Sequence, residues 1–286
     1  MVRHSGFAIC FCMGIVDFIL NLAGLLLWLN WRSVRFDPMM KRTPATLMGT
    51  LRPADPKKMR RWHLLAFLAG LLFLRAVAYR WMAPFWVGKL DLGVIVPPFR
   101  SDQFGGMLLF SFLSFGLVLG IFYVALLLLS LLRGPEPFHR LVKVPLGRVD
   151  EWSAGLKIIL PFLTATILWV ALSWVLGRMQ LAPEPNSVAH WLEQSIVVGL
   201  SSYQIWKFPL AALLLLHLLN SYVYFGKHPF WIYVNATAQK ALRPLKRIPL
   251  QVGKVDFTPV LGIALVFLFA KAFGWSLNWL FARLPI

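Results

Sequence analysis

The chain is poor in charged residues and in cysteine. Asp, Glu, Lys and Arg make up only 14% of its 286 residues, whereas roughly 25% is typical of a soluble domain. The two cysteines, Cys10 and Cys12, are too few for a disulfide framework or a cysteine-ligated metal site. On a helix, residues two apart point to nearly opposite faces, so these two cannot readily bridge each other. These shortages exclude an ordinary soluble domain and a fold held by disulfides.

Recognised catalytic motifs are also missing. The chain has no Gly-x-Ser-x-Gly, no His-Glu-x-x-His, no glycine-rich phosphate loop and no Cys-x-x-Cys pair. His217 stands alone in an apolar segment, without a second histidine or carboxylate at ligand spacing, so we expect a packing histidine and not a haem or metal ligand. We therefore expect a protein that is not an enzyme and carries no cofactor.

Long apolar runs take the place of these features. Hydrophobic residues make up 59% of the chain, and the mean hydropathy is +0.69. A run of about 18 or more such residues is long enough to cross a bilayer as a helix. We therefore predict an all-α membrane protein whose six transmembrane helices span residues 7–31, 62–82, 107–132, 156–176, 208–224 and 259–280.

The basic residues concentrate on alternate loops. The chain carries 29 Lys and Arg against 11 Asp and Glu, a net charge of +18. Nine of the basic residues fall in loop 32–61, four in loop 133–155 and six in loop 225–258. By the positive-inside rule these three loops face the cytoplasm and both termini lie outside. We expect the charge to serve orientation and attraction to anionic lipids, and not nucleic-acid binding.

Two of the basic loops repeat one pattern. Segments 137–150 and 243–256 each contain a Pro, an Arg three residues later, a second Pro, and Gly-Arg/Lys-Val-Asp. We infer three tandem helical hairpins: an N-terminal hairpin over 1–103, which is a degenerate or added unit, and two repeats over 104–180 and 181–286.

Short amphipathic helices are expected beside the spans. Residues 229–242 alternate apolar and polar groups at helical spacing, which favours a helix in the inner interface. The mixed segment 191–203 favours an interfacial helix on the outer side. After the first of these, Gly253 suits a turn, and Asp256 or Thr258 would cap the last span.

Asp17 is the only acid within a predicted span core. At 1.5 Å per residue it lies about 15 Å from the outer end of the first span, and Arg75 lies about 10 Å from the outer end of the second. We predict that they pair. A packing ion pair is favoured over a proton or ion relay, because a single acid cannot form a chain across the bilayer.

The second copy of the repeat resembles a known family. Arg243-Pro-Leu-Lys-Arg-Ile-Pro, then Gly253-Lys-Val-Asp-Phe-Thr-Pro and an apolar helix, closely resembles the signature of the YggT (YlmG) family of bacterial and plastid membrane proteins. His228-Pro-Phe-Trp fits the family's entry into this loop. Segment 137–150 resembles the first of the two copies that members usually carry, although Glu-Trp-Ser follows Asp150 where the family has Phe-Ser/Thr-Pro. The resemblance covers about residues 105–280, so the first hairpin lies outside it.

The resemblance implies a role without an agreed catalytic residue. Members are linked to osmotic-shock tolerance, to cell division and nucleoid distribution, and to maturation of a photosynthetic cytochrome complex. The resemblance also implies a location in the bacterial plasma (inner) membrane. We expect a scaffold or assembly factor whose two repeated loops dock anionic lipid, another membrane protein or a second copy of the chain. The residues assigned to docking are Arg140, Lys143, Gly147, Asp150, Arg243, Lys246, Arg247, Gly253 and Asp256.

An oligomeric channel or transporter for ions or small solutes is the alternative. The internal repeat and the family's link to osmotic shock favour it. Each repeat enters from the same side, however, so the repeats are parallel and not inverted. Small residues in the last two predicted spans could support close packing or self-association: Ala211, Ala212, Gly262, Ala264 and Ala270.

Overall fold

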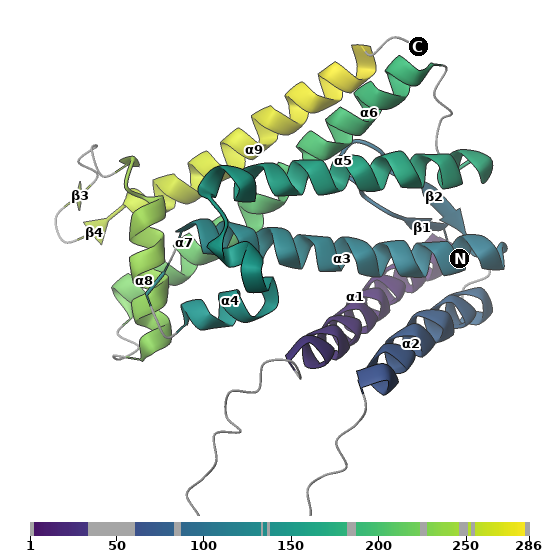
Figure 1. Cartoon of the computed structure of the whole chain (residues 1–286), viewed down its shortest axis with the longest axis horizontal. Helices are drawn as coiled ribbons and strands as arrows, with labels where there is room; N and C mark the ends of the chain where they lie inside the picture. The colour runs from purple at the N-terminus through teal and green to yellow at the C-terminus, as the bar shows by residue number, and fades with distance from the viewer. Residues whose placement is uncertain are drawn as a thin grey trace, which may run out of the picture. The chain divides into compact units, whose positions relative to one another are not determined.

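The computed structural model describes residues 3–33, 61–82, 87–132, 134–135, 138–181, 187–223, 228–245, 251–252 and 255–283, without the side chains of 3–13, 33, 61, 82, 251–252 and 255–256. Helices dominate this part of the chain (Figure 1). They are α1 Arg3–Ser33, α2 Arg61–Met82, α3 Phe104–Leu132, α4 His139–Leu146, η3 Gly147–Glu151, α5 Ala154–Arg178, α6 Val188–Ser201, η4 Ser202–Trp206, α7 Lys207–Tyr222, α8 Pro229–Ala241 and α9 Thr258–Arg283, where η marks 3-10 helix.

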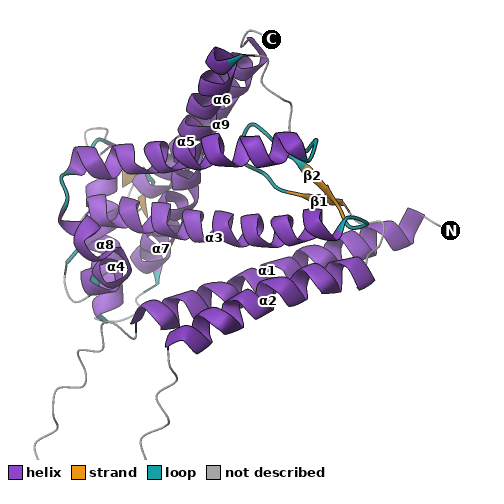
Figure 2. Cartoon of the chain, turned by 45° about the vertical axis from the view of Figure 1, so that its right-hand side comes forward, coloured by secondary structure: helices purple, strands orange, loops and turns teal. Residues whose placement is uncertain are grey.

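Strand is confined to two short pairs among the described residues (Figure 2). β1 Val87–Lys89 pairs with β2 Pro98–Arg100, and β3 Gln251–Val252 pairs antiparallel with β4 Val255–Asp256. Neither sheet is large enough to bury a core. The predicted all-α class is therefore confirmed.

Six helical stretches are long and apolar enough to cross a membrane, as predicted. They are Gly14–Arg32, Trp62–Trp81, Phe104–Leu132, Ala154–Arg178, Val188–Tyr222 and Thr258–Arg283. Large apolar side chains point outward along them, including Phe18, Phe67, Leu168 and Phe269. Such side chains are costly in water and suit lipid. The chain is a multi-pass membrane protein.

The predicted fifth span, 208–224, corresponds to α7 Lys207–Tyr222, but the candidate span that contains it is longer than predicted. The candidate span begins at Val188, because α6, η4 and α7 follow one another without a break. The segment looks too polar in sequence, but its serine hydroxyls donate to carbonyls of their own helix: Ser195 to Trp191 (2.7 Å), Ser201 to Val198 (2.7 Å) and Ser202 to Gly199 (2.7 Å). Serines satisfied in this way are compatible with an apolar environment.

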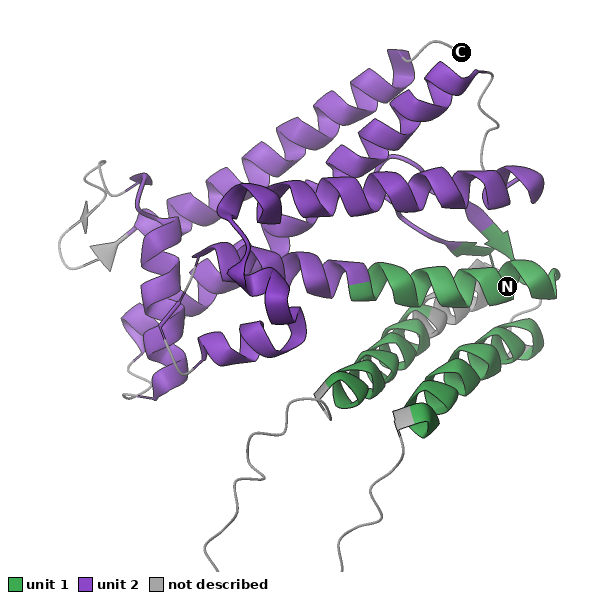
Figure 3. Ribbon diagram, viewed as in Figure 1, with its two compact units in different colours: residues 1–88, 99–119 green, residues 89–98, 120–286 purple. Residues whose placement is uncertain are grey.

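The chain forms two compact units, coloured separately in Figure 3. Unit 1 comprises Met1–Gly88 and Phe99–Leu119, and unit 2 comprises Lys89–Pro98 and Gly120–Ile286. The division into three hairpins at 103 and 180 rests on the sequence repeat and stays a prediction.

Unit 1 is built from α1, α2 and the first part of α3. α1 packs along α2, and Leu68, Leu72 and Phe115 form a buried apolar cluster. Gly24 of α1 allows this packing, since a Cβ there would lie 2.9 Å from the ring of Phe115. Close approach of helices at a glycine is the usual packing device in membranes.

Unit 2 contains two close helix pairs, α5 with α6 and α7 with α9. Gly199 brings α6 against α5, since its Cβ would lie 2.1 Å from Thr166 Oγ1. Gly262 of α9 packs on Leu242 and Leu214 in the same way. Among the small residues proposed for close packing, Gly262 thus makes a contact inside the chain.

Each repeated loop of unit 2 carries a short helix. α4 and η3 connect α3 to α5, while α8 lies between α7 and α9 and packs on α7. The predicted helix over 229–242 is confirmed, and its apolar side, including Val234 and Ala238, is buried. The two loops meet, because the ring of Phe138 packs against those of His228, Phe230 and Tyr233.

Candidate functional site

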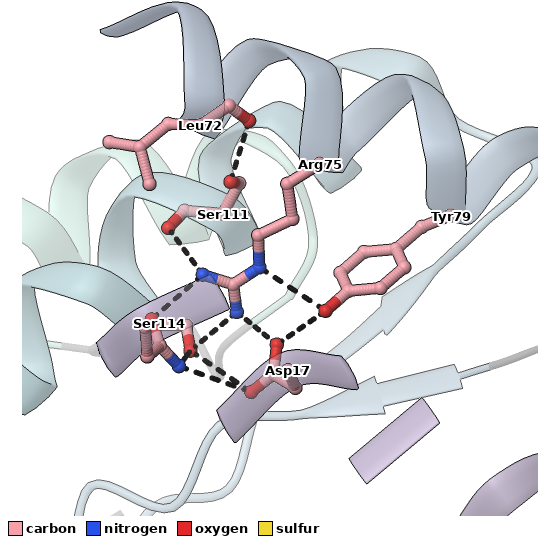
Figure 4. A network of polar contacts seen from close by, with 7 residues as sticks. Asp17, Leu72, Arg75, Tyr79, Ser111 and Ser114 are labelled. Carbon is pink, nitrogen blue, oxygen red and sulfur yellow. Dashed lines mark hydrogen bonds and ion pairs between the residues drawn. The ribbon is translucent and has the colours of Figure 1, made fainter. Parts of the chain in front are cut away.

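The first polar cluster lies in unit 1 around Arg75, whose side chain is fully buried. Arg75 comes from α2, Asp17 from α1 and Ser114 from α3, and Figure 4 shows the guanidinium between them. Arg75 Nη2 donates to Asp17 Oδ1, so the predicted ion pair is present. Lone charges within a bilayer are expensive, which explains why the only acid of the predicted span cores meets a cation.

Arg75 makes five hydrogen bonds, and a guanidinium has five N–H donors. Besides Asp17, the acceptors are Tyr79 Oη (3.2 Å), Asn21 Oδ1 (2.8 Å), the Ser111 carbonyl oxygen (3.5 Å) and Ser114 Oγ (2.9 Å). The guanidinium therefore has no donor left for an anionic substrate.

Asp17 is equally well satisfied. Its Oδ1 also accepts from Tyr79 Oη at 2.6 Å, and its Oδ2 accepts from Asn21 Nδ2 at 3.3 Å and from Ser114 Oγ at 3.5 Å. A polar network is stabilising in a low-dielectric interior only when its members are satisfied. This network meets that condition, which favours a packing role over a relay.

The second polar cluster lies in unit 2 around Asp150, at the end of the first repeated loop. Asp150 belongs to η3, and its carboxylate accepts from Ser130 Oγ at the end of α3. His139 Nε2 of α4 lies 3.2 Å from Asp150 Oδ2. Lys157 Nζ of α5 donates to Ser130 Oγ at 2.8 Å and to the Asp150 carbonyl oxygen at 2.6 Å. One aspartate thus connects the end of one candidate span, the loop helix and the start of the next span.

These groups are inside the protein. Ser130 is fully buried, Lys157 is 2% exposed and Asp150 is 8% exposed. Burial by itself raises the pKa of the Asp150 carboxyl, but the hydrogen bond from Ser130 and the charges of His139 and Lys157 outweigh it, so the pKa of Asp150 is lowered. The carboxylate is therefore ionised at neutral pH and compensates the buried ammonium.

The Ser130–Lys157 contact does not form a nucleophile and base. Lys157 donates to Ser130 while Ser130 donates to Asp150, so the amine acts as a donor in this arrangement. Ser130 also has no exposed surface at which a substrate could approach. The cluster acts as an internal clamp.

The clamp corrects one predicted docking residue. Asp150 is turned inward and cannot serve as an exposed contact, because its carboxylate compensates Lys157. The glycine at position 147 has a structural reason. It ends α4 at φ 61° and ψ −129°, a conformation that residues with a side chain resist. Its N–H donates to the Lys143 carbonyl.

The predicted basic contacts are exposed where the structure describes them. Arg140 and Lys143 lie on the outer side of α4, and Arg243 follows α8. Lys143 Nζ also lies 3.1 Å from Glu151 Oε1, an exposed ion pair. The other docking residues, Lys246, Arg247 and Gly253, and the side chain of Asp256, lie outside the described residues.

Sequence reasoning missed Lys157, Ser130 and His139 as a group. The available signal was Lys157 itself, a cation inside an apolar predicted span, which requires a counter-charge just as Arg75 does. The nearest acids before it are Asp150 and Glu151. His217 was predicted to be a packing histidine. In agreement with this, its Nδ1 lies 2.9 Å from Asn235 Oδ1 of α8.

Comparison with known proteins adds no relative. No family model matches the chain, and neither the curated proteins nor the solved structures contain a match. The resemblance to the YggT family thus rests on the motif around Arg243 and Gly253, and membership stays a proposal.

Proposed function

We propose that this chain is a non-enzymatic scaffold or assembly factor of the bacterial inner membrane, related to the YggT family. Its basic loops would dock a partner membrane protein or anionic lipid on the cytoplasmic side, in complex maturation, cell division or osmotic stress. The proposal places Arg140, Lys143 and Arg243 among the contacts, together with Lys246 and Arg247.

The proposal rests on the difference between the charged groups inside the protein and the basic groups on its loops. The buried groups Arg75, Lys157 and Asp150, and the half-buried Asp17, bond to one another and to neighbouring polar groups. The basic side chains of the repeated loops that the structure describes, including Arg140, Lys143 and Arg243, are exposed instead. Catalysis or transport needs polar groups that can exchange partners with a substrate, whereas docking needs charge that is exposed on the surface.

Photocrosslinking in intact cells tests the proposal. In one variant a photoreactive residue replaces Arg243. In the control variant it replaces Arg100, which is also exposed but belongs to a loop predicted to face outward. We expect one dominant protein to be captured from position 243 and not from position 100. Mass spectrometry of the captured species would then identify the client.

The opposite results are equally informative. Capture of only lipid or of a second copy at position 243 would contradict the scaffold and favour the oligomeric channel. Ion-flux measurements in liposomes would follow. Capture of one protein from both positions in equal amount would contradict docking through the basic loops.

A further inference from the structure

The surface formed by α4 and η3 has an unusual combination of exposed groups. Arg140 and Lys143 face outward from α4, and Arg148 faces outward from η3. The opposite side of α4 is apolar, and Val142, Pro145 and Leu146 are buried there. Val142 and Leu146 pack with Leu126 and Leu127 of α3. The short helix is thus fixed on the protein with its basic side outward.

Apolar side chains are also exposed in α4, just after η3 and at the start of α5. Leu141 is 64% exposed, Trp152 41% and Leu156 54%. Aromatic and long basic side chains occur together at the level of lipid head groups, where each reaches the environment it prefers. A surface with this mixture is suited to the boundary between head groups and acyl chains.

The position of α4 and η3 in the chain also favours a location at the depth of the lipid head groups. α4 and η3 connect the end of the candidate span Phe104–Leu132 to the start of Ala154–Arg178. A segment this short between two spans lies close to the membrane edge. The basic groups are therefore within reach of phosphates in the adjacent leaflet.

The local charge is positive because the clamp removes an acid from the surface. Asp150 is buried with Lys157 and His139, which leaves Glu151 as the exposed acid of the segment from 139 to 151, in contact with Lys143. Three exposed basic side chains thus face outward against one exposed acid.

We propose that the surface of Arg140, Lys143 and Arg148, flanked by Leu141 and Trp152, binds the phosphate head group of an anionic phospholipid. The arginines would contact phosphate oxygens, while Leu141 and Trp152 lie along the acyl chains. This inference rests on the proposed docking function, since it assigns the ligand of one of the two repeated loops. Crosslinking at Arg243 and lipid binding at α4 are separate measurements, so each can fail alone.

Phosphatidylglycerol binding to the detergent-solubilised full chain tests the inference, with native mass spectrometry as the readout. The variant Arg140→Gln/Lys143→Gln/Arg148→Gln removes the three charges. The control Arg80→Gln/Lys89→Gln/Arg100→Gln removes two arginines and one lysine that are also exposed. A basic group near an anionic surface contributes about fivefold in affinity, so we expect about tenfold or greater weakening in the first variant and near wild-type binding in the control.

Three further results decide the assignment. Arg140→Lys/Arg148→Lys, which keeps the charge, should retain most of the binding, and equal loss in this variant would point to misfolding and overturn the inference. Equal weakening in the control triple variant would overturn a local site. Competition by inorganic phosphate as strong as that by phosphatidylglycerol would show that a free anion, and not a lipid, is bound.

Discussion

Lys157 Nζ lies 2.6 Å from the backbone carbonyl oxygen of Asp150 and 4.0 Å from its carboxylate. The lysine belongs to the first turns of a candidate span, and the aspartate to the loop that precedes it. The contact fixes where the loop ends and the membrane helix begins. It also explains how a lysine is tolerated in an apolar helix, because both partners are compensated inside the protein.

Lys157→Met should destabilise the protein by about 3 kcal/mol, because removal of one partner of a buried ion pair leaves the other uncompensated. Thermal unfolding in detergent measures the loss. Lys271→Met is the matched control, since Lys271 is an exposed lysine of α9, and it should melt close to wild type. Equal melting of the two variants would contradict the clamp.

The stability that Asp150 contributes to the fold should depend on pH. Its pKa in the folded state is below the ordinary 3.8, so the contribution is present above pH 3.8 and is lost as the pH falls through the folded value. We therefore expect the stability gap between wild type and Asp150→Asn to narrow as the pH falls below 3.8. A stability gap between wild type and Asp150→Asn that stays constant as the pH falls would contradict the assigned pKa direction.

Asp17→Asn should lower stability by about 3 kcal/mol, because Arg75 would remain buried without a counter-charge. Asp102→Asn removes one partner of an exposed pair and should cost less than about 1 kcal/mol. The double variant Asp17→Asn/Arg75→Gln should lose less than the sum of its single variants, since the two residues interact. A stable Asp17→Asn protein that loses proton flux in liposomes would instead support the relay.

Gly147→Ala should destabilise the protein by about 1–3 kcal/mol, because alanine is strained at the positive φ that ends α4. Gly155→Ala is the control: this glycine lies in the first turn of α5, and a Cβ there would meet nothing within 4 Å. The control should be neutral or slightly stabilising. Comparable losses in both variants would mean that the α4 turn imposes no special constraint.

Much of the fold follows from local sequence properties. Apolar length alone predicts six spans, since a bilayer imposes a minimum number of hydrophobic residues on each helix. The amphipathic pattern of 229–242 predicts α8 for a similar reason. The Asp17–Arg75 pair is also predictable, because one acid and one base in apolar helices have few alternative partners.

Other features depend on contacts between segments distant in sequence. The extension of the fifth helical stretch back to Val188 was not predicted, because Ser201 and Ser202 satisfy their hydroxyls within the helix, which composition does not reveal. Asp150 looks like an exposed charge of a basic loop, yet it faces Ser130, His139 and Lys157 from three other helices.

The sequence by itself determined the class of the protein, its spans and its repeat, because these depend on hydrophobic length and on short motifs. Only the tertiary structure decided which charges are internal and which face outward. The reason is physical: the cost of burying Asp150 or Arg75 is offset by hydrogen bonds to partners on other helices. Helix packing, and not position in the chain, brings those partners together.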